Sequence, residues 1–460
     1  MQTKRDQLQA HNFVVGRMRS ALLHGDADAL ETPTRRFSVA AFAGALVAGL
    51  IAAACGVYGL FFPGGDDGWR ASGSIIVEQE TGARYLYDPT TETLHPALNY
   101  ASARLVAGAG AVVRTVSTRS LSGVRHGPAL GIPGAPDDVP APAELSSAPW
   151  LVCAAPGTAP STTVVLGQDL PAAPLPEDQA VLVATPAGQR HLIWHTRRLR
   201  VVDATASVVF GLDATRPVPV ADTWLNAVPA GPDLRPPDLA GRGSAGPVVD
   251  GVATRVGQVL RIAADATGSA EDYRLVLPDG LLAVPPTVAG LALADPANRA
   301  AYPGGEPRAI AVSSAGVVAA PRSAADLDFA DLPQRPPTLL APADLGGRSL
   351  CARTAVDGQA RQDLVLAAVA GLPAATPRRG DDSRAAEHIA VPAGGGVLAR
   401  TGQARYLITD LGLAFPLSPG GATALGYDAA AAAEVPATLL ALVPRGPVLD
   451  PAAAGDFAQR

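Results

Sequence analysis

The sequence predicts an α+β membrane protein, in which a single N-terminal transmembrane helix precedes a large body of repeated strand and helix units. Two observations lead to this prediction. Residues 35–62, RRFSVAAFAGALVAGLIAAACGVYGLFF, contain two arginines followed by 26 residues without a charge. The remainder of the chain carries two short signatures that recur at nearly constant spacing. At 460 residues, the chain is long enough for two or three ordinary domains.

The composition favours a packed, loop-rich protein. Glycine (48 residues) and proline (43 residues) are abundant, but 48% of the chain is hydrophobic, which is unusual for a disordered protein. The formal net charge is -6, and Lys4 is the single lysine. Because proteins that bind nucleic acids usually carry a basic surface, this balance gives no support to nucleic-acid binding.

Residues 37–62 are long enough to cross a bilayer as a helix. Roughly 26 residues at ~1.5 Å each span ~39 Å, against a hydrocarbon core of ~30 Å. A removable export signal is one alternative, but its apolar region normally has only about 7–15 residues. A lipid-modified cysteine at Cys55 is another, although Ala52 stands three residues before it, where leucine is usual. We therefore expect a retained single span.

The charges beside the span predict its orientation. Arg35 and Arg36 precede it, whereas Asp66 and Asp67 follow it. Because basic residues stay on the cytoplasmic side, residues 1–36 should be cytoplasmic and the bulk of the chain periplasmic. Aromatic residues suited to the outer interface are Tyr58, Phe61, Phe62 and Trp69.

The segment RDQLQAHNFVVGRMRSALLHGD, residues 5–26, predicts a short amphipathic helix. Leu8, Met18 and Leu22 recur near helical spacing. Such an apolar stripe suits docking on a neighbouring membrane protein. It equally suits a helix that rests on the lipid surface with its arginines near anionic headgroups. The pattern leaves both alternatives open.

The external part contains an internal repeat. A strand-like signature centres on Tyr85, His191 and Tyr406, with a weaker copy near Tyr273. Its four copies are ARYLYD at 83–88, QRHLIW at 189–194, DYRLVL at 272–277 and ARYLITD at 404–410.

A second signature, L-x-x-V-x-x-G-P-x-L, begins at Leu121, Leu225 and Leu440. These leucines follow the first signature by 36, 34 and 34 residues, so three pairs lie in register. The unit near Tyr273 lacks the Gly-Pro ending, which leaves its boundaries uncertain. The Gly-Pro pairs are Gly127-Pro128, Gly231-Pro232 and Gly446-Pro447.

Each unit is predicted as a hairpin plus a helix of about 50–60 residues, too small to bury much core alone. Neighbouring units must therefore pack on one another. Residues 248–262, together with RSLCARTA and DLVLAAVAG, predict additional strands that form a central β-structure among the repeats.

Cys153 and Cys351 both fall on the predicted periplasmic side, an oxidising compartment in bacteria. Each adjoins a strand-like run, so a disulfide is expected, and two buried thiols are the alternative. A bridge would stabilise the body by on the order of 2–4 kcal/mol. Cys55 lies within the span, where a small apolar role is expected.

No catalytic, metal or cofactor site is predicted. A phosphate-binding P-loop needs a lysine after its glycines, and Lys4 lies on the N-terminal segment. The stretches LGGRSL (345–350) and GGGV (394–397) are predicted to be turns. His191 and His195 would share a metal on a helix, but on the predicted strand they lie ~13 Å apart.

Several stretches resemble the EccB family, the membrane-anchored core component of the ESX, or type VII, secretion system. They are the cytoplasmic segment, PTRR before the span, YDPTTETLHPALNYASARL, GIPGAPD, WLVC and the C-terminal YLITDLGLAFPL with VPATLLALVPRGPVLD. The resemblance implies an elongated periplasmic domain of four repeats around a central β domain, with Cys153 paired to Cys351. It also implies assembly with EccC, EccD and EccE and with other copies of the chain.

With this resemblance, we expect a cytoplasmic segment at 1–36, a span at 37–62 and a linker at 63–74. The repeats are expected at 75–135, 181–240, 266–335 and 389–460. The central domain is expected in three parts, at 136–180, 241–265 and 336–388.

The predicted function is that of a structural subunit that scaffolds the periplasmic part of the secretion complex. ATP hydrolysis is an alternative, with ATP as the cofactor, because relatives in the family are often described as ATPases. Binding of the cell wall by the repeats is a third possibility.

Overall fold

The structure is a computed structural model that describes residues 3–25, 27, 33–61, 67–155, 159–263, 271–327, 329–355, 361–368, 376–377 and 384–456. The chain divides into two compact units. Unit 1 is Met1–Arg70 with Val116–Gly123, and unit 2 is Ala71–Thr115 with Val124–Arg460.

Unit 1 contains two long helices, α1 (Lys4–His24) and α2 (Pro33–Phe61), and the short η1 (Asp67–Arg70) and α4 (Thr118–Leu121). The Thr3 amide and hydroxyl donate to Asp6, which satisfies donors at the start of α1. The predicted stripe of Leu8, Met18 and Leu22 is exposed. Residues 37–58 of α2 form a candidate membrane span without a buried side chain.

Each of the four repeats begins with a three-stranded antiparallel meander, followed by a helix and a fourth strand. Repeat 1 contains β1 (Ser74–Glu78), β2 (Arg84–Asp88), β3 (Thr93–Pro96), α3 (Tyr100–Ala107), β4 (Val112–Val116) and β5 (Arg125–His126). Repeat 2 contains β9 (Gln179–Ala184), β10 (Arg190–Trp194), β11 (Arg197–Arg200), α5 (Ala204–Phe210), η3 (Leu212–Ala214), β12 (Val218–Pro219) and α6 (Asp222–Ala227).

Repeat 3 contains β15 (Val259–Ile262), β16 (Asp272–Leu277), β17 (Gly280–Val284), α7 (Pro286–Ala294), η4 (Pro296–Ala301), β18 (Ile310–Val312) and α8 (Ser314–Ala319). Repeat 4 contains β24 (Gly396–Thr401), β25 (Ala404–Thr409), β26 (Ala414–Leu417), α9 (Gly421–Leu425), η6 (Ala429–Ala431), β27 (Ala433–Glu434) and α10 (Ala437–Leu440), and α11 (Pro451–Gly455) follows. In repeats 2, 3 and 4 the fourth strand runs parallel to the first.

The central domain is a seven-stranded sheet in the order β22-β23-β7-β6-β20-β21-β8. Side chains alternate between its two faces along each strand. On β6, Trp150 and Val152 enter one hydrophobic cluster, whereas Leu151 and Cys153 enter another on the opposite face. The strands are β6 (Trp150–Ala155), β7 (Ser161–Val165), β8 (Ala172–Pro174), β20 (Ser349–Thr354), β21 (Gln362–Ala367), β22 (Thr376–Pro377) and β23 (His388–Ala390), and η2 (Pro142–Glu144) and η5 (Pro342–Leu345) precede β6 and β20.

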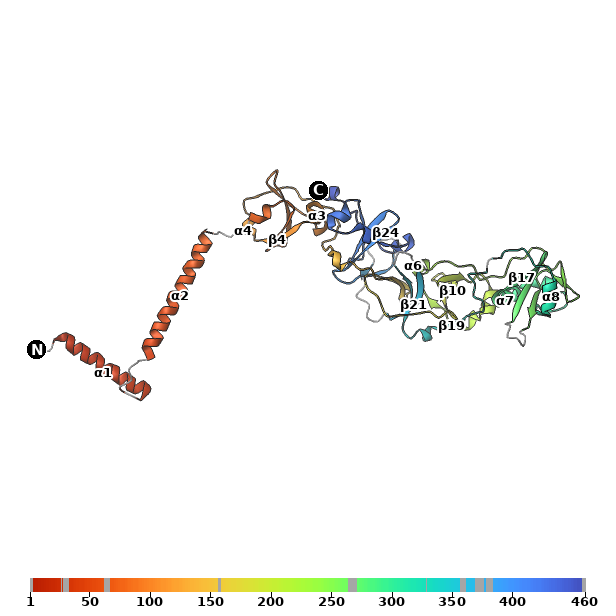
Figure 1. The fold of residues 1–460 in the computed structure, drawn as a ribbon, viewed down its shortest axis with the longest axis horizontal. Helices are drawn as coiled ribbons and strands as arrows, with labels where there is room; N and C mark the ends of the chain where they lie inside the picture. Colours follow the sequence, from red (N-terminus) through yellow and green to blue (C-terminus); the bar gives the residue numbers. More distant parts are fainter. Residues whose placement is uncertain are drawn as a thin grey trace. The chain divides into compact units, whose positions relative to one another are not determined.

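Hydrophobic cores are shared between neighbouring parts of unit 2. One core joins the Trp150 face of the central sheet to repeats 2 and 4. A second core joins repeat 2 to repeat 3, and a third joins repeat 4 to repeat 1. The order of contact is therefore repeat 1, repeat 4, central sheet, repeat 2, repeat 3, as Figure 1 shows within this unit.

Three expectations from the sequence were wrong. Residues 241–265 do not join the central sheet: β13 (Ala245–Val249) pairs with β14 (Val252–Arg255), and β15 pairs with β16 in repeat 3. The first signature marks the second strand of each meander, and in repeat 3 the strand before it, β15, was therefore assigned to the central domain. Likewise β19 (Thr338–Leu340) pairs with β9 of repeat 2. Trp69, expected at the membrane interface, is fully buried.

Candidate functional site: the disulfide and the repeat junctions

A disulfide joins Cys153 to Cys351 across the middle of the central sheet. The two cysteines are register partners on β6 and β20, with their Cα atoms 4.0 Å apart. Both are fully buried among apolar side chains that include Val165 and Val365. Because they are separated by 198 residues, the bond ties an early and a late part of the sequence into one sheet. The predicted pairing is present.

The leucines that begin the second signature are buried. Leu225 in α6 and Leu440 in α10 lie in the core that covers the Trp150 face of the central sheet. Leu121 in α4 of unit 1 is also buried. In repeats 2 and 4, the signature therefore anchors the short second helix on the central sheet.

The first-signature residues lie on the second strand of each meander. Tyr406 is buried, and the guanidinium of Arg445 lies 5.6 Å from its ring centroid. Tyr85 is half-buried and meets the His126 ring edge-on at 5.3 Å. His191 is buried on β10, and burial, together with the charges of nearby arginines, lowers its pKa.

The glycines of the second signature lie where a returning segment crosses the third strand. The amides of Gly127, Gly231 and Gly446 donate to the carbonyls of Leu94, Arg198 and Ala414 at 2.8, 2.9 and 3.0 Å. A Cβ added to each glycine would come within 2.3–2.5 Å of a third-strand side chain. The side chains concerned are His95, Leu199 and Phe415.

The prolines that follow, Pro128, Pro232 and Pro447, have no amide hydrogen and so cannot donate to a ladder. The Pro128 carbonyl lies 3.0 Å from Nδ1 of His95. The Gly-Pro pair thus combines a close approach with one missing donor. Pairing resumes two residues later, where the amides of Leu130, Leu234 and Leu449 donate to the carbonyls of Pro96, Arg200 and Pro416.

In repeat 3, different residues form the corresponding crossing. Ser323 takes the place of the glycine, and its amide donates to the Leu281 carbonyl at 3.0 Å. Here the glycine is on the strand instead, because a Cβ on Gly280 would lie 2.5 Å from the Pro321 carbonyl oxygen. Asp279 fixes the returning segment by accepting from the hydroxyl of Ser323 and the amide of Ala324. The match of repeat 3, weak in sequence, is therefore clear in structure.

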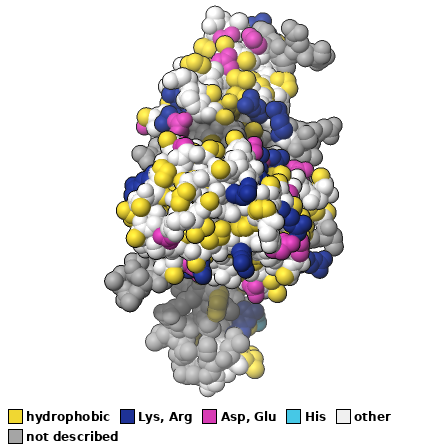
Figure 2. Space-filling model, turned by 90° about the vertical axis from the view of Figure 1, so that its right-hand side faces the viewer, with side chains coloured by type: hydrophobic (Ala, Val, Ile, Leu, Met, Phe, Trp, Pro, Cys, Tyr) yellow, Lys and Arg dark blue, Asp and Glu magenta, His cyan; other side chains and the backbone are white. Residues whose placement is uncertain are grey.

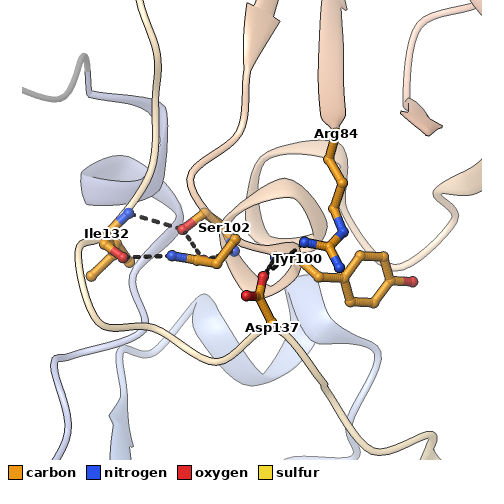
Figure 3. Close-up of polar contacts among 6 residues, drawn as sticks. Arg84, Tyr100, Ser102, Ile132 and Asp137 are labelled. Carbon is orange, nitrogen blue, oxygen red and sulfur yellow. Dashed lines mark hydrogen bonds and ion pairs between the residues drawn. The ribbon is translucent and has the colours of Figure 1, made fainter. Parts of the chain in front are cut away.

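The stretch GIPGAPD follows the Gly-Pro pair of repeat 1 and is hydrogen-bonded to α3 and to the residue before it (Figure 3). The buried Ser102 hydroxyl donates to the Asn99 side chain and accepts from the Ile132 amide at 2.9 Å. The Asn99 amide donates to the Ile132 carbonyl at 2.8 Å. Asp137 accepts from Arg84 at 2.8 Å, and Ile132 then packs into the core shared with repeat 4.

Hydrogen bonds also join repeat 2 to the central sheet. The indole of Trp224 donates to the Val152 carbonyl at 3.0 Å, and the Gln362 side chain donates to the Ala227 carbonyl at 2.7 Å. The Thr223 hydroxyl of repeat 2 donates to the Glu387 carboxylate, which adjoins β23, at 3.3 Å. Because these donors and acceptors are at least partly buried, each bond is more costly to lose than a surface contact.

The stretches that might have bound phosphate or metal do not have the required geometry. LGGRSL leads into β20 and GGGV into β24, whereas a phosphate cradle leads into a helix N-terminus. His191 lies on β10, and His195 lies in the following turn, stacked on Trp194 with ring centroids 4.6 Å apart. Among the residues that the structure describes, no group of His, Cys, Asp or Glu side chains is arranged to hold a metal ion.

The orienting arginines, Arg35 and Arg36, lie in the first turn of α2, and their side chains fall outside the described residues. On the molecular face seen in Figure 2, hydrophobic, basic and acidic side chains are interspersed. This face therefore lacks the continuous basic surface typical of nucleic-acid binding.

Comparison with known proteins places these features in a family. The family model described as "Type VII secretion system ESX-1, transport TM domain B" matches residues 1–456. The chain is 38% identical over 301 residues to the ESX-3 secretion system ATPase EccB3 of Mycolicibacterium smegmatis, covering 62% of this chain and 56% of that relative. It therefore spans little more than half the length of that relative.

A longer alignment relates the chain to the ESX-2 secretion system ATPase EccB2 of Mycobacterium tuberculosis, at 28% identity over 494 residues, 97% of this chain and 93% of that one. The fold matches a chain in the intact ESX-5 inner membrane complex, with a TM-score of 0.69 at 24% identity, covering 100% of this chain and 96% of that one.

A chain of the EccB3 dimer from the ESX-3 core complex matches with a TM-score of 0.66 at 26% identity, covering 83% of this chain and 99% of that one. Helix α2 is long and apolar enough to cross a membrane, and the family model that matches the chain is described as a transport TM domain. By its match to the family model over residues 1–456, the chain belongs to the EccB family of type VII secretion proteins.

Proposed function

We propose that the protein is a structural subunit of a type VII secretion complex in the inner membrane. The observation that carries this proposal is the family match over residues 1–456, which includes the candidate span and the whole repeat body. Its partners are other core components of such a complex, EccC, EccD and EccE, and other copies of the chain. The similar EccB3 chain was solved as a dimer, which supports self-association.

The body suits a scaffold because its recurring signatures serve packing. The signature leucines and glycines of repeats 2 and 4 form the core and the strand crossings of unit 2. Shared cores make each of these repeats rigid against the central sheet, which a subunit that positions its neighbours requires. Shape and rigidity, rather than a reactive side chain, are what this part of the molecule supplies.

The proposed orientation places α1 in the cytoplasm and the repeat body in the periplasm, with a single pass through the membrane. Arg35 and Arg36 before the span and Asp66 and Asp67 after it support this orientation. The exposed stripe on α1 is available for a neighbouring subunit or for the lipid surface.

ATP hydrolysis is the second candidate, because the relatives from M. smegmatis and M. tuberculosis are named ATPases. The chain's single lysine and the strands that follow its glycine stretches count against a P-loop site. A hydrolysis assay on the purified full chain should show no turnover beyond that of a mock preparation. Turnover that follows the protein through repeated purification would favour the enzymatic function.

Co-purification tests the scaffold. A C-terminally tagged copy, expressed at native level and extracted in mild detergent, should retain the other membrane components of the secretion complex. A variant with Leu8, Met18 and Leu22 changed to serine should lose partners that dock on α1 while it remains in the membrane. Recovery of the wild-type chain alone, as a monomer, would overturn the proposal.

A further inference from the structure

A polar cleft lies where repeat 2, the central sheet and repeat 4 meet. Its volume is about 540 Å³, within the range of sites that bind small molecules. Repeat 2 contributes Arg198 and Asn226, the central sheet contributes Thr354 and Gln362, and repeat 4 contributes Thr438. Repeat 2, the central sheet and repeat 4 therefore all supply its walls.

The register of the strands places three of these side chains on the side of the shared core, where the cleft lies. Thr354 follows Leu350 and Ala352 at alternate positions of β20, and both of these face the core shared with repeats 2 and 4. Gln362 is the register partner of Thr354 and donates to the Ala227 carbonyl on that same side. Arg198 is the partner of Ile193, which also faces that core.

The Thr354 hydroxyl is an unusual feature of this cleft. Thr354 is only 1% exposed, and within the part of the chain that the structure describes its Oγ1 has no hydrogen-bond partner. A buried hydroxyl without a partner costs roughly 1–3 kcal/mol. A ligand in the cleft would supply the missing bond.

Arg198 provides a positive charge that no acidic side chain of the described residues pairs with. Its guanidinium donates to Oδ1 of Asn226 at 3.4 Å, and no Asp or Glu of the described ranges lies within ion-pair distance. Its neighbours differ: Arg197 pairs with Asp331 at 3.1 Å, and Arg200 pairs with Asp233 at 2.6 Å. Arg198 is half-buried, so its charge is less screened than that of the exposed Arg200.

These features together select the chemistry of the ligand. Among the residues that the structure describes, the lining contains no acidic side chain, and its hydroxyls, amides and guanidinium offer several hydrogen-bond donors. A single unpaired cation balances a single negative charge, and a guanidinium matches a carboxylate in geometry. Pro229, Pro436 and Leu439 add an apolar wall.

We propose that this cleft binds a monocarboxylate with a small apolar substituent, whose carboxylate accepts hydrogen bonds from the Arg198 guanidinium and the Thr354 hydroxyl. The carboxylate is that of a small acid or the free C-terminus of a peptide. This binding function is independent of the scaffold function, because it needs neither a partner subunit nor the membrane span.

The test uses the full chain in detergent and titrates N-acetylalanine, followed by saturation-transfer NMR. Its neutral amide, N-acetylalaninamide, and inorganic phosphate are the matched controls. We expect saturable binding of the carboxylate in the millimolar range, as befits a fragment of this size, and at least about tenfold weaker binding of the amide. A short peptide with a free C-terminus, compared with its amidated form, distinguishes the peptide source from a small acid.

Two variants assign the contacts. Arg198→Gln should weaken binding at least about tenfold, since it removes the charge-assisted bonds. Thr354→Val should weaken binding about fivefold without lowering the melting temperature, because it removes a hydroxyl that has no partner in the protein. Arg200→Gln, on the same strand outside the cleft, should bind as the wild type does.

Thr354→Val keeps the test decisive if Arg198→Gln fails to fold. Equal binding of N-acetylalanine and its amide, stronger binding of phosphate, or no saturable signal for the wild type would each overturn the proposal. Unchanged binding by Thr354→Val would overturn the assigned position of the carboxylate.

Discussion

The glycines of the second signature cannot be replaced without a steric clash, because a side chain from the third strand occupies the space where a Cβ would be. At Gly446, an added Cβ would lie 2.4 Å from the Phe415 ring, which is fully buried. Gly446→Ala should therefore lower the free energy of unfolding by about 1–3 kcal/mol through overpacking. Urea denaturation of the full chain measures this change.

Gly455→Ala is the matched control in the same repeat. No atom lies within 4 Å of a Cβ built there, and the residue ends helix α11. This variant should leave the urea midpoint unchanged or raise it slightly, because alanine favours helix. Equal midpoints for the two variants would show that the crossing tolerates a side chain.

His191 makes the free energy of unfolding of the repeat body depend on pH. Its pKa is lowered from the ordinary value of 6.5, first by burial and then by the charges of Arg198 and Arg200. Since the unfolded chain binds the proton more readily, this contribution is fully present above pH 6.5 and is lost as the pH falls below it. The wild type should lose more stability between pH 7 and pH 5 than His191→Gln, as thermal melts would measure. Parallel pH profiles would contradict this assignment.

At the scale of elements, the signatures predicted the second strand and the anchoring helix of each repeat. Tyr85, His191 and Tyr406 all lie on second strands, and Leu225 and Leu440 lie on helices as expected. The first strand of the meander was missed in repeats 1, 2 and 4, because it carries no shared motif. In repeat 3 it was predicted as a strand but assigned to the central domain. The fourth strand was missed because it is only two or three residues long in repeats 2, 3 and 4, too short for a period to be visible.

The stability of the GIPGAPD segment, which follows the Gly-Pro pair of repeat 1, should depend on the Ser102 hydroxyl. Ser102→Ala leaves the Ile132 amide without the partner that it has at 2.9 Å in a buried site. We expect a loss of about 1–3 kcal/mol. Faster hydrogen exchange should be confined to residues near 130–136.

Ser122→Ala is the control for that experiment, because the Ser122 hydroxyl donates to the Arg119 carbonyl at an exposed position. It should leave exchange near 130–136 unchanged. If Ser102→Ala also leaves that exchange unchanged, the segment is held by its apolar contacts and the hydrogen bonds are secondary.

The disulfide should stabilise the protein chiefly by restricting the conformations of the unfolded chain. Replacing both Cys153 and Cys351 with alanine should lower the free energy of unfolding by about 2–5 kcal/mol, since a long loop is then left open. Because both sulfurs are buried, the native wild type should resist reductant and become sensitive only in denaturant. Cys55→Ala, in the candidate span, is the control and should behave as the wild type. Equal unfolding midpoints for the alanine pair and the wild type, without reductant, would contradict this role.

For the whole molecule, the order of the packed parts could not be predicted from the sequence. Repeat 4 packs on repeat 1, and the two are separated by most of the chain. The apolar runs of β9 and β24 do indicate strands buried on both faces, as Val181 and Leu182 enter different cores. Which neighbour covers each face depends on contacts between distant residues, and these leave no periodic trace.

The orientation in the membrane is the prediction that most affects function, because it decides which side the repeat body occupies. Single cysteines at Ala10 and Ser72, both exposed, report on the two sides of the span once Cys55 is replaced by alanine. Cys153 and Cys351 stay bonded and buried, so they do not react. In intact spheroplasts, a membrane-impermeant maleimide should label Ser72→Cys and leave Ala10→Cys unlabelled until the cells are lysed.

Replacing Arg35 and Arg36 with glutamate should allow part of the population to insert the other way, because it removes the positive flank that retains the N-terminus. In that variant, Ala10→Cys should become labelled in intact spheroplasts while labelling at Ser72→Cys falls. Conservative replacement of both arginines with lysine preserves the charge and should retain the wild-type pattern. Labelling of Ala10→Cys in the wild-type background would reverse the proposed topology and place the repeat body, with its disulfide, in the cytoplasm. The bond would then lie in a compartment that normally keeps cysteines reduced.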